Sequence, residues 1–189
     1  MLSHLRPAVA LLVGFTVLTG VLYPLAITGI AGVVAPAAAS GSLVEVDGKP
    51  VGSSLIGQDF VKPGYLHPRP SATGYNAASS GATNLGPTSA ALIASVAEKQ
   101  AAYQAENGVA GPIDAVTTSG SGLDPDISPE NARDQTGRIA AARGVDPAAV
   151  EAVIDAEAKG KWLGLYGEPR VNVLAVNLAL DAAFPIAGN

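Results

Sequence analysis

The sequence predicts an α+β protein that has one N-terminal transmembrane helix followed by a single helix-dominated extracytoplasmic domain with a few short strands. Two observations carry this prediction. No charged side chain occurs from Pro7 to Val44, whereas all sixteen acidic and ten of the eleven basic residues follow from Glu45 onward. In that charged part, short β-type segments and well-capped helical segments are separated by polar loops. The 189 residues have room for one ordinary domain and an anchor.

Residues 8–34 form the predicted transmembrane helix. They are uncharged and would make a helix of roughly 40 Å, at about 1.5 Å per residue, whereas a bilayer core needs only about 20 apolar residues. Pro24 should kink this helix or mark its emergence into the membrane interface beside Tyr23. A cleaved signal peptide is the alternative, because small residues follow at positions 35–40. We favour a retained anchor, since a signal peptide has an apolar region of only about 7–15 residues.

The flanking charges predict the orientation of the helix. Arg6 and the terminal amine precede the span, and Glu45 and Asp47 are the first charged side chains after it. Positive charge remains on the cytoplasmic side, so residues 1–7 are predicted to be cytoplasmic and the domain of residues 43–189 extracytoplasmic. The small residues at positions 35–42 are typical of a flexible linker.

The first half of the outer domain should contain two strands, a long loop and a helix. Leu43–Val46 and Gly52–Gln58 are the predicted strands, joined by a turn at residues 47–50. Residues 62–84 are rich in Pro, Gly, Ser and Asn, but their embedded aromatic residues favour an ordered loop. A helix is predicted over Pro87–Glu106. Its expected apolar face is formed by Ala91, Ile93, Val96, Ala97 and Ala101.

The second half should begin with a strand over Ile113–Thr118 and an ordered loop through residues 119–126. Two well-marked helices follow. The first has Ser128 as N-cap, Pro129 at the first position and Gly144 past its end. The second repeats this pattern, with Asp146, Pro147 and Gly160 in the corresponding places.

The last segment, Val171–Phe184, fits a strand or a helix. We favour a helix, because Asn172 can cap one that turns Val173, Val176, Leu180 and Phe184 inward. In the loop before it, Trp162 and Tyr166 are expected to pack onto the core.

The chain lacks the common signatures of catalysis and metal binding. It has no cysteine, and its histidines are His4 and His67, so thiol chemistry and an ordinary zinc site are excluded within one chain. The phosphate-binding, nucleophile-elbow and H-E-x-x-H motifs are absent. Asp124 and Asp126 have a spacing that loosely resembles a calcium loop, but nearby prolines disrupt it. The net charge of −5 argues against nucleic-acid binding. We therefore predict no catalytic residue and no metal site.

Two other classes of function stay open. The first is a membrane-tethered hydrolase that uses His67 with a serine such as Ser71. The second is a tethered module that binds a solute or peptide. His67, flanked by prolines in a polar loop, fits a loop-bracing residue better than a general base. Arg69 could brace the same loop or face a partner subunit.

Three segments resemble one family in sequence and order: RPSATGYNAASSGATNLGPTS (Arg69–Ser89), TTSGSGLDPDISPENARDQTGRIAAARG (Thr117–Gly144) and GEPRVNVLAVNLALD (Gly167–Asp181). They look like the signatures of the C subunit of the Kdp-type, ATP-driven potassium pump of bacteria. The N-terminal span, the element GSSLIGQDF and the overall length agree with that family. The resemblance covers essentially the whole chain.

This resemblance implies an accessory subunit, not itself an enzyme, in the bacterial inner membrane. The implied partners are a channel-like A subunit, a P-type ATPase B subunit and a small F subunit, besides the lipid bilayer. In the family, the C subunit is described as stabilising the complex and as a catalytic chaperone that raises the ATP affinity of the B subunit. No tightly bound cofactor is implied, and ATP would be met through the B subunit. Gln135 matches a glutamine proposed to contact nucleotide.

The charge pattern speaks against a direct nucleotide contact. It places Gln135 outside the cytoplasm, whereas ATP is inside. We therefore expect the domain to stabilise the outward face of the A and B subunits or to cover the potassium entrance. The loops at residues 62–84 and 117–128 are the expected contact surfaces. The candidate contact residues in them are Arg69, Tyr75, Asn76, Asn84, Asp124 and Asp126.

Overall fold

The structure is a computed structural model that describes residues 4–186. These residues form two compact units, one ending at Val51 and the other beginning at Gly52. The mixture of helices and short strands confirms the predicted α+β class. The division lies within the second strand that the structure forms, Lys49–Ser53, so the first strand pair belongs mainly with the N-terminal unit.

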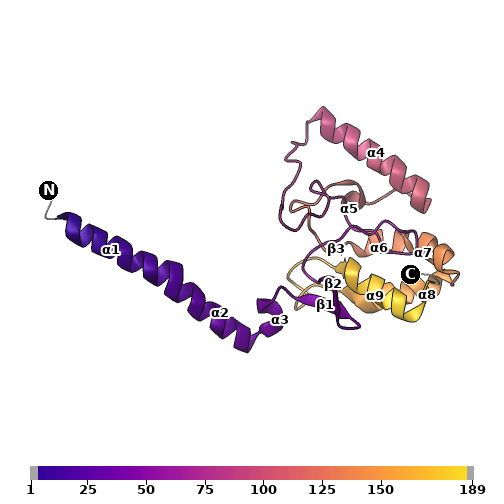
Figure 1. The fold of residues 1–189 in the computed structure, drawn as a ribbon. Coiled ribbons are helices and arrows are strands. Elements are labelled where there is room, and N and C mark those ends of the chain that lie inside the picture. The colour runs from indigo at the N-terminus through magenta and orange to yellow at the C-terminus, as the bar shows by residue number, and fades with distance from the viewer. Residues whose placement is uncertain (1–3, 187–189) are drawn as a thin grey trace. The chain divides into compact units, whose positions relative to one another are not determined.

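The N-terminal unit begins with one long apolar helix (Figure 1). It runs from Leu5 to Val34 with a mean hydropathy of 2.1, and it is long and apolar enough to cross a membrane. Within it, α1 (Leu5–Val17) passes into a widened π-helical turn, η2 (Leu18–Leu22), before α2 (Tyr23–Val34). The widened turn directly precedes Pro24, whose ring crowds the preceding turn and whose nitrogen cannot donate a hydrogen bond. The helix therefore continues past the proline through a local change of pitch.

The predicted linker contains one helical turn, α3 (Pro36–Ala39), which its composition did not predict. The strands β1 (Leu43–Val46) and β2 (Lys49–Ser53) then form a hairpin. Asp47 and Gly48 both have positive φ, as a tight two-residue hairpin turn requires. The first strand is thus confirmed, whereas the prediction of a strand over residues 52–58 is wrong. The two-residue turn lets the second strand begin at Lys49 and end at Ser53.

The second unit contains six helices and three short strands among its described residues, 52–186 (Figure 1). Their order is α4 (Ala90–Asn107), α5 (Ile113–Val116), β3 (Asp126–Ile127), α6 (Pro129–Asp134), α7 (Thr136–Arg143), α8 (Pro147–Glu157), β4 (Ala158–Lys159), β5 (Arg170–Asn172) and α9 (Val173–Ala183). The strands pair in the antiparallel order β3-β5-β4. Val171, in the central strand, lies opposite both Ile127 and Ala158.

One apolar cluster holds this unit together. It combines Leu66 of the long loop with residues from α6 to α9 and from the sheet. Its buried members are Leu66, Ile127, Ala132, Ile139, Ala140, Val150, Ile154, Val171, Val173, Val176 and Leu180. The Asn172 side chain accepts a hydrogen bond from the Ala175 amide, which confirms the predicted cap of α9. Val173, Val176 and Leu180 point inward as predicted, and Phe184 packs against the cluster.

Three predictions about helices and strands are wrong in detail. Residues 113–116 form the short helix α5 and not a strand. Asp114 lies in the first turn of this helix, where a negative charge is favourable. The helix predicted from Pro129 to Arg143 is divided at Gln135 into α6 and α7. Helix α8 ends at Glu157, because the next two residues pair with β5.

The apolar face predicted for α4 is also wrong. None of the residues of α4 is buried, and Ile93 is 63% exposed. The helix packs instead through a more polar face that includes Tyr103, whose hydroxyl donates to the side-chain oxygen of Asn131 at 3.0 Å. Alanines separated by polar residues give only a weak amphipathic signal, so the sequence could not distinguish these faces.

The two long loops pack against each other. Residues 71–81 approach residues 121–122, where the Ser71 hydroxyl donates to the Gly122 carbonyl at 2.6 Å and the Gly81 amide donates to the Ser121 carbonyl at 2.8 Å. Gly122 has φ +69°, and a Cβ atom there would lie 2.8 Å from the Gly81 carbonyl oxygen. Both the backbone conformation and the space at this position therefore require glycine.

Replacing Gly122 with alanine should destabilise the domain by about 1–3 kcal/mol, because the new side chain strains the backbone and pushes the two loops apart. At about 2–4 °C per kcal/mol, the melting temperature should fall by several degrees. Thermal unfolding of the detergent-solubilised chain measures this change. The matched control is Gly120→Ala, since a Cβ atom at Gly120 meets nothing within 4 Å. Equal melting temperatures for the two variants would contradict the packing argument.

Candidate functional site

A proline-rich segment, residues 62–70, belongs to no strand and places Leu66 in the core of the second unit. Buried backbone groups must find hydrogen-bond partners, and here side chains from the helices supply them. The Asn177 carboxamide accepts from the Leu66 amide at 2.7 Å and donates to the Leu66 carbonyl at 3.0 Å. Gln135 does the same for the next residue, at 2.8 Å to the His67 amide and 3.1 Å to the His67 carbonyl. Two buried carboxamides thus replace the neighbouring strand that this segment lacks.

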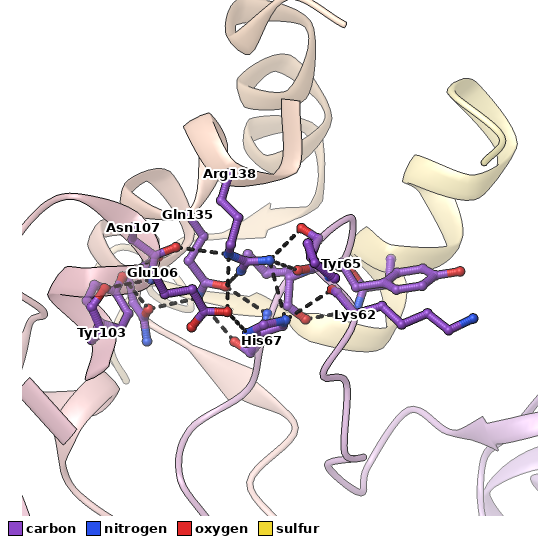
Figure 2. Close-up of polar contacts among 12 residues, drawn as sticks. Lys62, Tyr65, His67, Tyr103, Glu106, Asn107, Gln135 and Arg138 are labelled. Atoms are coloured by element: carbon purple, nitrogen blue, oxygen red, sulfur yellow. Dashed lines mark hydrogen bonds and ion pairs between the residues drawn. The ribbon is translucent and has the colours of Figure 1, made fainter. Parts of the chain in front are cut away.

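Two arginines complete this support. Arg138 donates to the carbonyls of Pro63 and Tyr65 at 2.6 and 2.9 Å (Figure 2). The Arg143 side chain is fully buried and donates to the Gly64 carbonyl at 2.7 Å. Arg143 also pairs with Asp181 at 2.9 Å, so its buried charge is neutralised.

The same guanidinium closes the end of α9. It donates to the carbonyl of Leu180, which also accepts from the Phe184 amide, and to the carbonyl of Phe184, the residue directly after the helix. It also lies 5.1 Å from the centre of the Tyr65 ring. Arg143 therefore joins the proline-rich segment to the last helix.

Gln135 lies at the break between α6 and α7 and is 1% exposed. Its oxygen also accepts from Arg138 at 2.6 Å, and its nitrogen also donates to the Asn131 side chain at 2.9 Å. Both acceptor positions and both N–H groups of the carboxamide are therefore occupied. A ligand that hydrogen-bonded to Gln135 in this arrangement would have to displace one of these partners.

A cavity of about 190 Å³ lies beside this network, lined in part by His67, Tyr103, Glu106 and Gln135 (Figure 2). Sites for small organic ligands are usually about 300–1,000 Å³. The cavity is thus small for a nucleotide in the arrangement that the structure shows.

His67 braces the wall of this cavity. Its Nδ1 lies 3.1 Å from a Glu106 oxygen, and its Nε2 lies 3.1 Å from the Lys62 carbonyl and 3.3 Å from Arg138. Burial lowers the pKa of His67 below its ordinary 6.5, and the neighbouring Arg138 charge lowers it further, against the opposite effects of the Lys62 carbonyl and the Glu106 carboxylate. This confirms the bracing role that the sequence suggested for His67.

The contacts of Ser71 bear on the hydrolase alternative. Its hydroxyl donates to Gly122 and accepts from the amides of Thr73 and Tyr75. Among the described residues, no hydrogen bond joins this hydroxyl to His67. The serine and the histidine of the hydrolase alternative therefore each have other hydrogen-bond partners.

The structure brings together four of the six candidate contact residues, namely Arg69, Tyr75, Asp124 and Asp126. Arg69 pairs with Asp124 at 3.0 Å, and both line a hollow of about 470 Å³ together with Asp126. Asp126 in turn pairs with Arg170 at 3.1 Å. Arg69 therefore links its loop to Asp124, while a quarter of its side chain remains exposed, and its contact with a partner subunit stays a prediction.

Tyr75 contacts this group through Arg69, whereas Asn76 and Asn84 lie apart from it. The Tyr75 hydroxyl donates to the Arg69 carbonyl, and burial, with the Asp59 charge, raises the pKa of Tyr75 to about 12. Asn76 and Asn84 are exposed, and within residues 4–186 their side chains make only local hydrogen bonds, with Ala78 and Ala82. These two asparagines are thus the candidates most accessible to a partner.

Sequence reasoning missed Asn177, Arg138 and Arg143 as central residues. Asn177 carried a usable signal, because it is a polar residue on the otherwise apolar face of α9, and such a residue needs a buried partner. The two arginines carried no such signal, because a cation near the C-terminal end of a helix is usually explained by its favourable interaction with that helix.

Comparison with known proteins identifies the family. The family model described as "KdpC: K+-transporting ATPase, c chain" matches residues 5–182. The chain belongs to the KdpC family. A potassium-transporting ATPase KdpC subunit from Cereibacter sphaeroides is 64% identical, with 97% of this chain and 99% of the relative covered. KdpC subunits from Caulobacter vibrioides and Bradyrhizobium diazoefficiens are 58% and 53% identical over 98% and 97% of this chain, and 96% and 98% of the relatives.

Membership of the KdpC family confirms the resemblance seen in the sequence and makes the chain an accessory subunit of a potassium pump. The match includes both the apolar helix and the second unit. The polar network around residues 62–70 is therefore part of a KdpC-type domain.

The lowered pKa of His67 predicts that acid destabilises the domain. The unfolded chain binds a proton at this histidine near pH 6.5, whereas the folded chain resists protonation until lower pH. Stability should consequently fall as the pH drops from 7.5 through 6.5 towards the lower folded-state pKa. Chemical denaturation at a series of pH values measures this loss.

In His67→Gln the pH dependence between 7.5 and 5.5 should be weaker than in the unsubstituted chain. His4→Gln is the matched control, since it removes the other histidine, and it should leave the pH dependence unchanged. A His67→Gln profile that matches the unsubstituted chain would refute this assignment.

Proposed function

We propose that this chain is a single-pass accessory subunit that stabilises a potassium-transporting ATPase from outside the cytoplasm. The family match over residues 5–182 carries the proposal. The apolar helix Leu5–Val34 is the anchor, and the charges around it favour a cytoplasmic N-terminus. The partners are the A, B and F subunits that the family resemblance implies, in the inner membrane of a bacterium.

The contacts inside the second unit support a structural role. No group of three or more His, Asp or Glu side chains in residues 4–186 is placed to bind a metal ion. The polar groups nearest to a catalytic arrangement, His67 and Ser71, are used to hold loops in place. These contacts weigh against the tethered hydrolase and favour a rigid platform for other subunits.

The same contacts bear on the proposed effect on ATP affinity. Gln135 is buried and fully hydrogen-bonded, and the domain lies outside the cytoplasm in our proposal. We therefore attribute any rise in the ATP affinity of the B subunit to stabilisation of the assembled complex. Direct contact between Gln135 and nucleotide is the competing explanation.

The exposed loops should form the contact surface with the other subunits. Asn76→Arg places a long cation on this surface and should reduce recovery of the A and B subunits with the tagged chain at least tenfold, equivalent to about 1.4 kcal/mol. Quantitative mass spectrometry of the detergent-solubilised complex measures this recovery. Ala156→Arg adds the same charge at an exposed position of α8 and should leave the recovery unchanged. Equal recovery from both variants would remove Asn76 from the interface.

Two carboxamide variants distinguish the structural role of Gln135 from nucleotide contact. Gln135→Ala leaves the amide and carbonyl of His67 without their side-chain partner, and Asn177→Ala does the same for Leu66, so each should cost about 1–3 kcal/mol of stability. Of these two residues, Gln135 lines the cavity and Asn177 does not. If both residues act structurally, the two variants should change the ATP affinity of the purified complex to the same extent. Melting temperatures and ATP titrations provide the two readouts.

A loss of ATP affinity in Gln135→Ala alone, at equal melting temperatures, would support nucleotide contact instead. Nucleotide contact also requires a cytoplasmic domain. A reporter enzyme fused after Asn189 that is active only in the cell interior would therefore refute the proposed orientation.

A further inference from the structure

Residues 160–168, between β4 and β5, form a small loop with an apolar tip. Trp162 and Tyr166 pair as an antiparallel bridge, and their ring centres are 5.8 Å apart. Trp162, Leu163, Leu165 and Tyr166 are respectively 68%, 72%, 77% and 64% exposed. The prediction that Trp162 and Tyr166 pack onto the core is therefore wrong, because the bridge makes them pack against each other at the surface.

Four large apolar side chains within five residues form an unusual surface in water. Isolated exposed leucines are common, but a contiguous apolar patch indicates an interaction site. The patch gains free energy if a partner removes it from water, at roughly 25 cal/mol per Å² of apolar area. The remaining question is the chemistry of that partner.

The backbone of the tip favours a lipid partner. The amides of Trp162, Gly164, Leu165 and Tyr166 all donate to carbonyls within the loop, at 2.8–3.1 Å. In a lipid environment, where water is scarce, backbone groups must be satisfied internally. The loop meets this condition for four of its amides before any partner binds.

The charges around the tip favour phospholipid as well. Residues 158–167 contain Lys159 and Lys161 and no acidic side chain, in a chain with a net charge of −5. Lys161 also lies 3.5 Å from Glu168, at the base of the loop. Tryptophan and tyrosine concentrate at membrane interfaces, and lysine side chains can extend from there towards the phosphates. The loop combines all three residue types.

The covalent chain allows this contact. Eighteen residue steps separate Val34 from Gly52, a reach of at most roughly 60 Å. A domain of this size is roughly 30–40 Å across. The anchor therefore keeps the second unit near the bilayer.

We propose that the tip formed by Trp162, Leu163, Leu165 and Tyr166 inserts into the headgroup region of the bilayer that anchors the chain. This gives the chain a second membrane contact besides its transmembrane helix. The inference rests on the anchoring that we propose above, but not on assembly with the other subunits.

Trp162 is the only tryptophan of the chain, so it reports this contact directly. The full chain would be reconstituted into phosphatidylcholine–phosphatidylglycerol vesicles that carry bromine on the acyl chain at shallow or deep positions. Insertion predicts Trp162 emission at shorter wavelength than in the urea-unfolded chain, with stronger quenching by shallow bromine. The double variant Leu163→Asn/Leu165→Ser should lose both effects, whereas the control Ile93→Ser/Ile113→Ser, at two exposed positions elsewhere, should keep them.

Two results would overturn the proposal. One is Trp162 emission like that of the unfolded chain, without quenching by bromine at either depth. The other is a shift to shorter wavelength that requires the other pump subunits and shows no lipid quenching, which would assign the loop to a protein partner. Resistance to alkaline extraction tests the anchor separately. An unquenched Trp162 in a chain that resists extraction would thus reject the loop contact while leaving the proposed function in place.

Discussion

The second unit depends on how the buried N–H and C=O groups in the backbone of residues 62–70 find hydrogen-bond partners. This segment crosses the domain without a neighbouring strand, and three of its nine residues are prolines, which have no amide hydrogen to donate. The remaining polar groups are bonded mainly by Asn177, Gln135, Arg138 and Arg143. An unpaired buried backbone group costs about 1–3 kcal/mol, so these side chains are needed for the segment to remain inside. Leu66 can then join the apolar core.

This arrangement explains why the most polar region of the domain does not resemble an active site. Catalytic groups need a free lone pair or proton that faces a substrate. Here the carboxamide of Gln135 is saturated, the His67 ring lies between Glu106, Lys62 and Arg138, and Ser71 bonds to the neighbouring loop. The polar groups hold a fixed shape, which agrees with the structural role that we propose.

Two regions on the surface of the second unit differ in their chemistry. The loops around Asn76 and Asn84 expose small polar groups, whereas the tip around Trp162 exposes large apolar ones next to lysines. A protein partner would bind the first region through polar contacts, and a lipid surface would bind the second through apolar contacts. In our two proposals, the first region contacts the pump complex and the second contacts the membrane around it.

Much of the fold follows from local chemistry that the sequence displays. The uncharged run before Glu45 predicted the apolar helix, and the caps Ser128, Asp146 and Asn172 predicted where α6, α8 and α9 begin, because a capping side chain bonds to amides only two or three residues away. The ends of helices were less predictable. Helix α8 stops early because Ala158 and Lys159 pair with β5, a contact with residues more than ten positions away.

The family was likewise predictable, since its motifs lie in the order of the sequence. The roles of individual side chains were not. By itself, the sequence determined the apolar helix, the starts of α6, α8 and α9, the exclusion of cysteine chemistry and the family, because each depends on residues close together or on composition. Only the tertiary structure decided that Gln135 and Asn177 support residues 66–67 and that Trp162 is exposed. Those outcomes depend on which distant segments compete for the same space and the same hydrogen bonds.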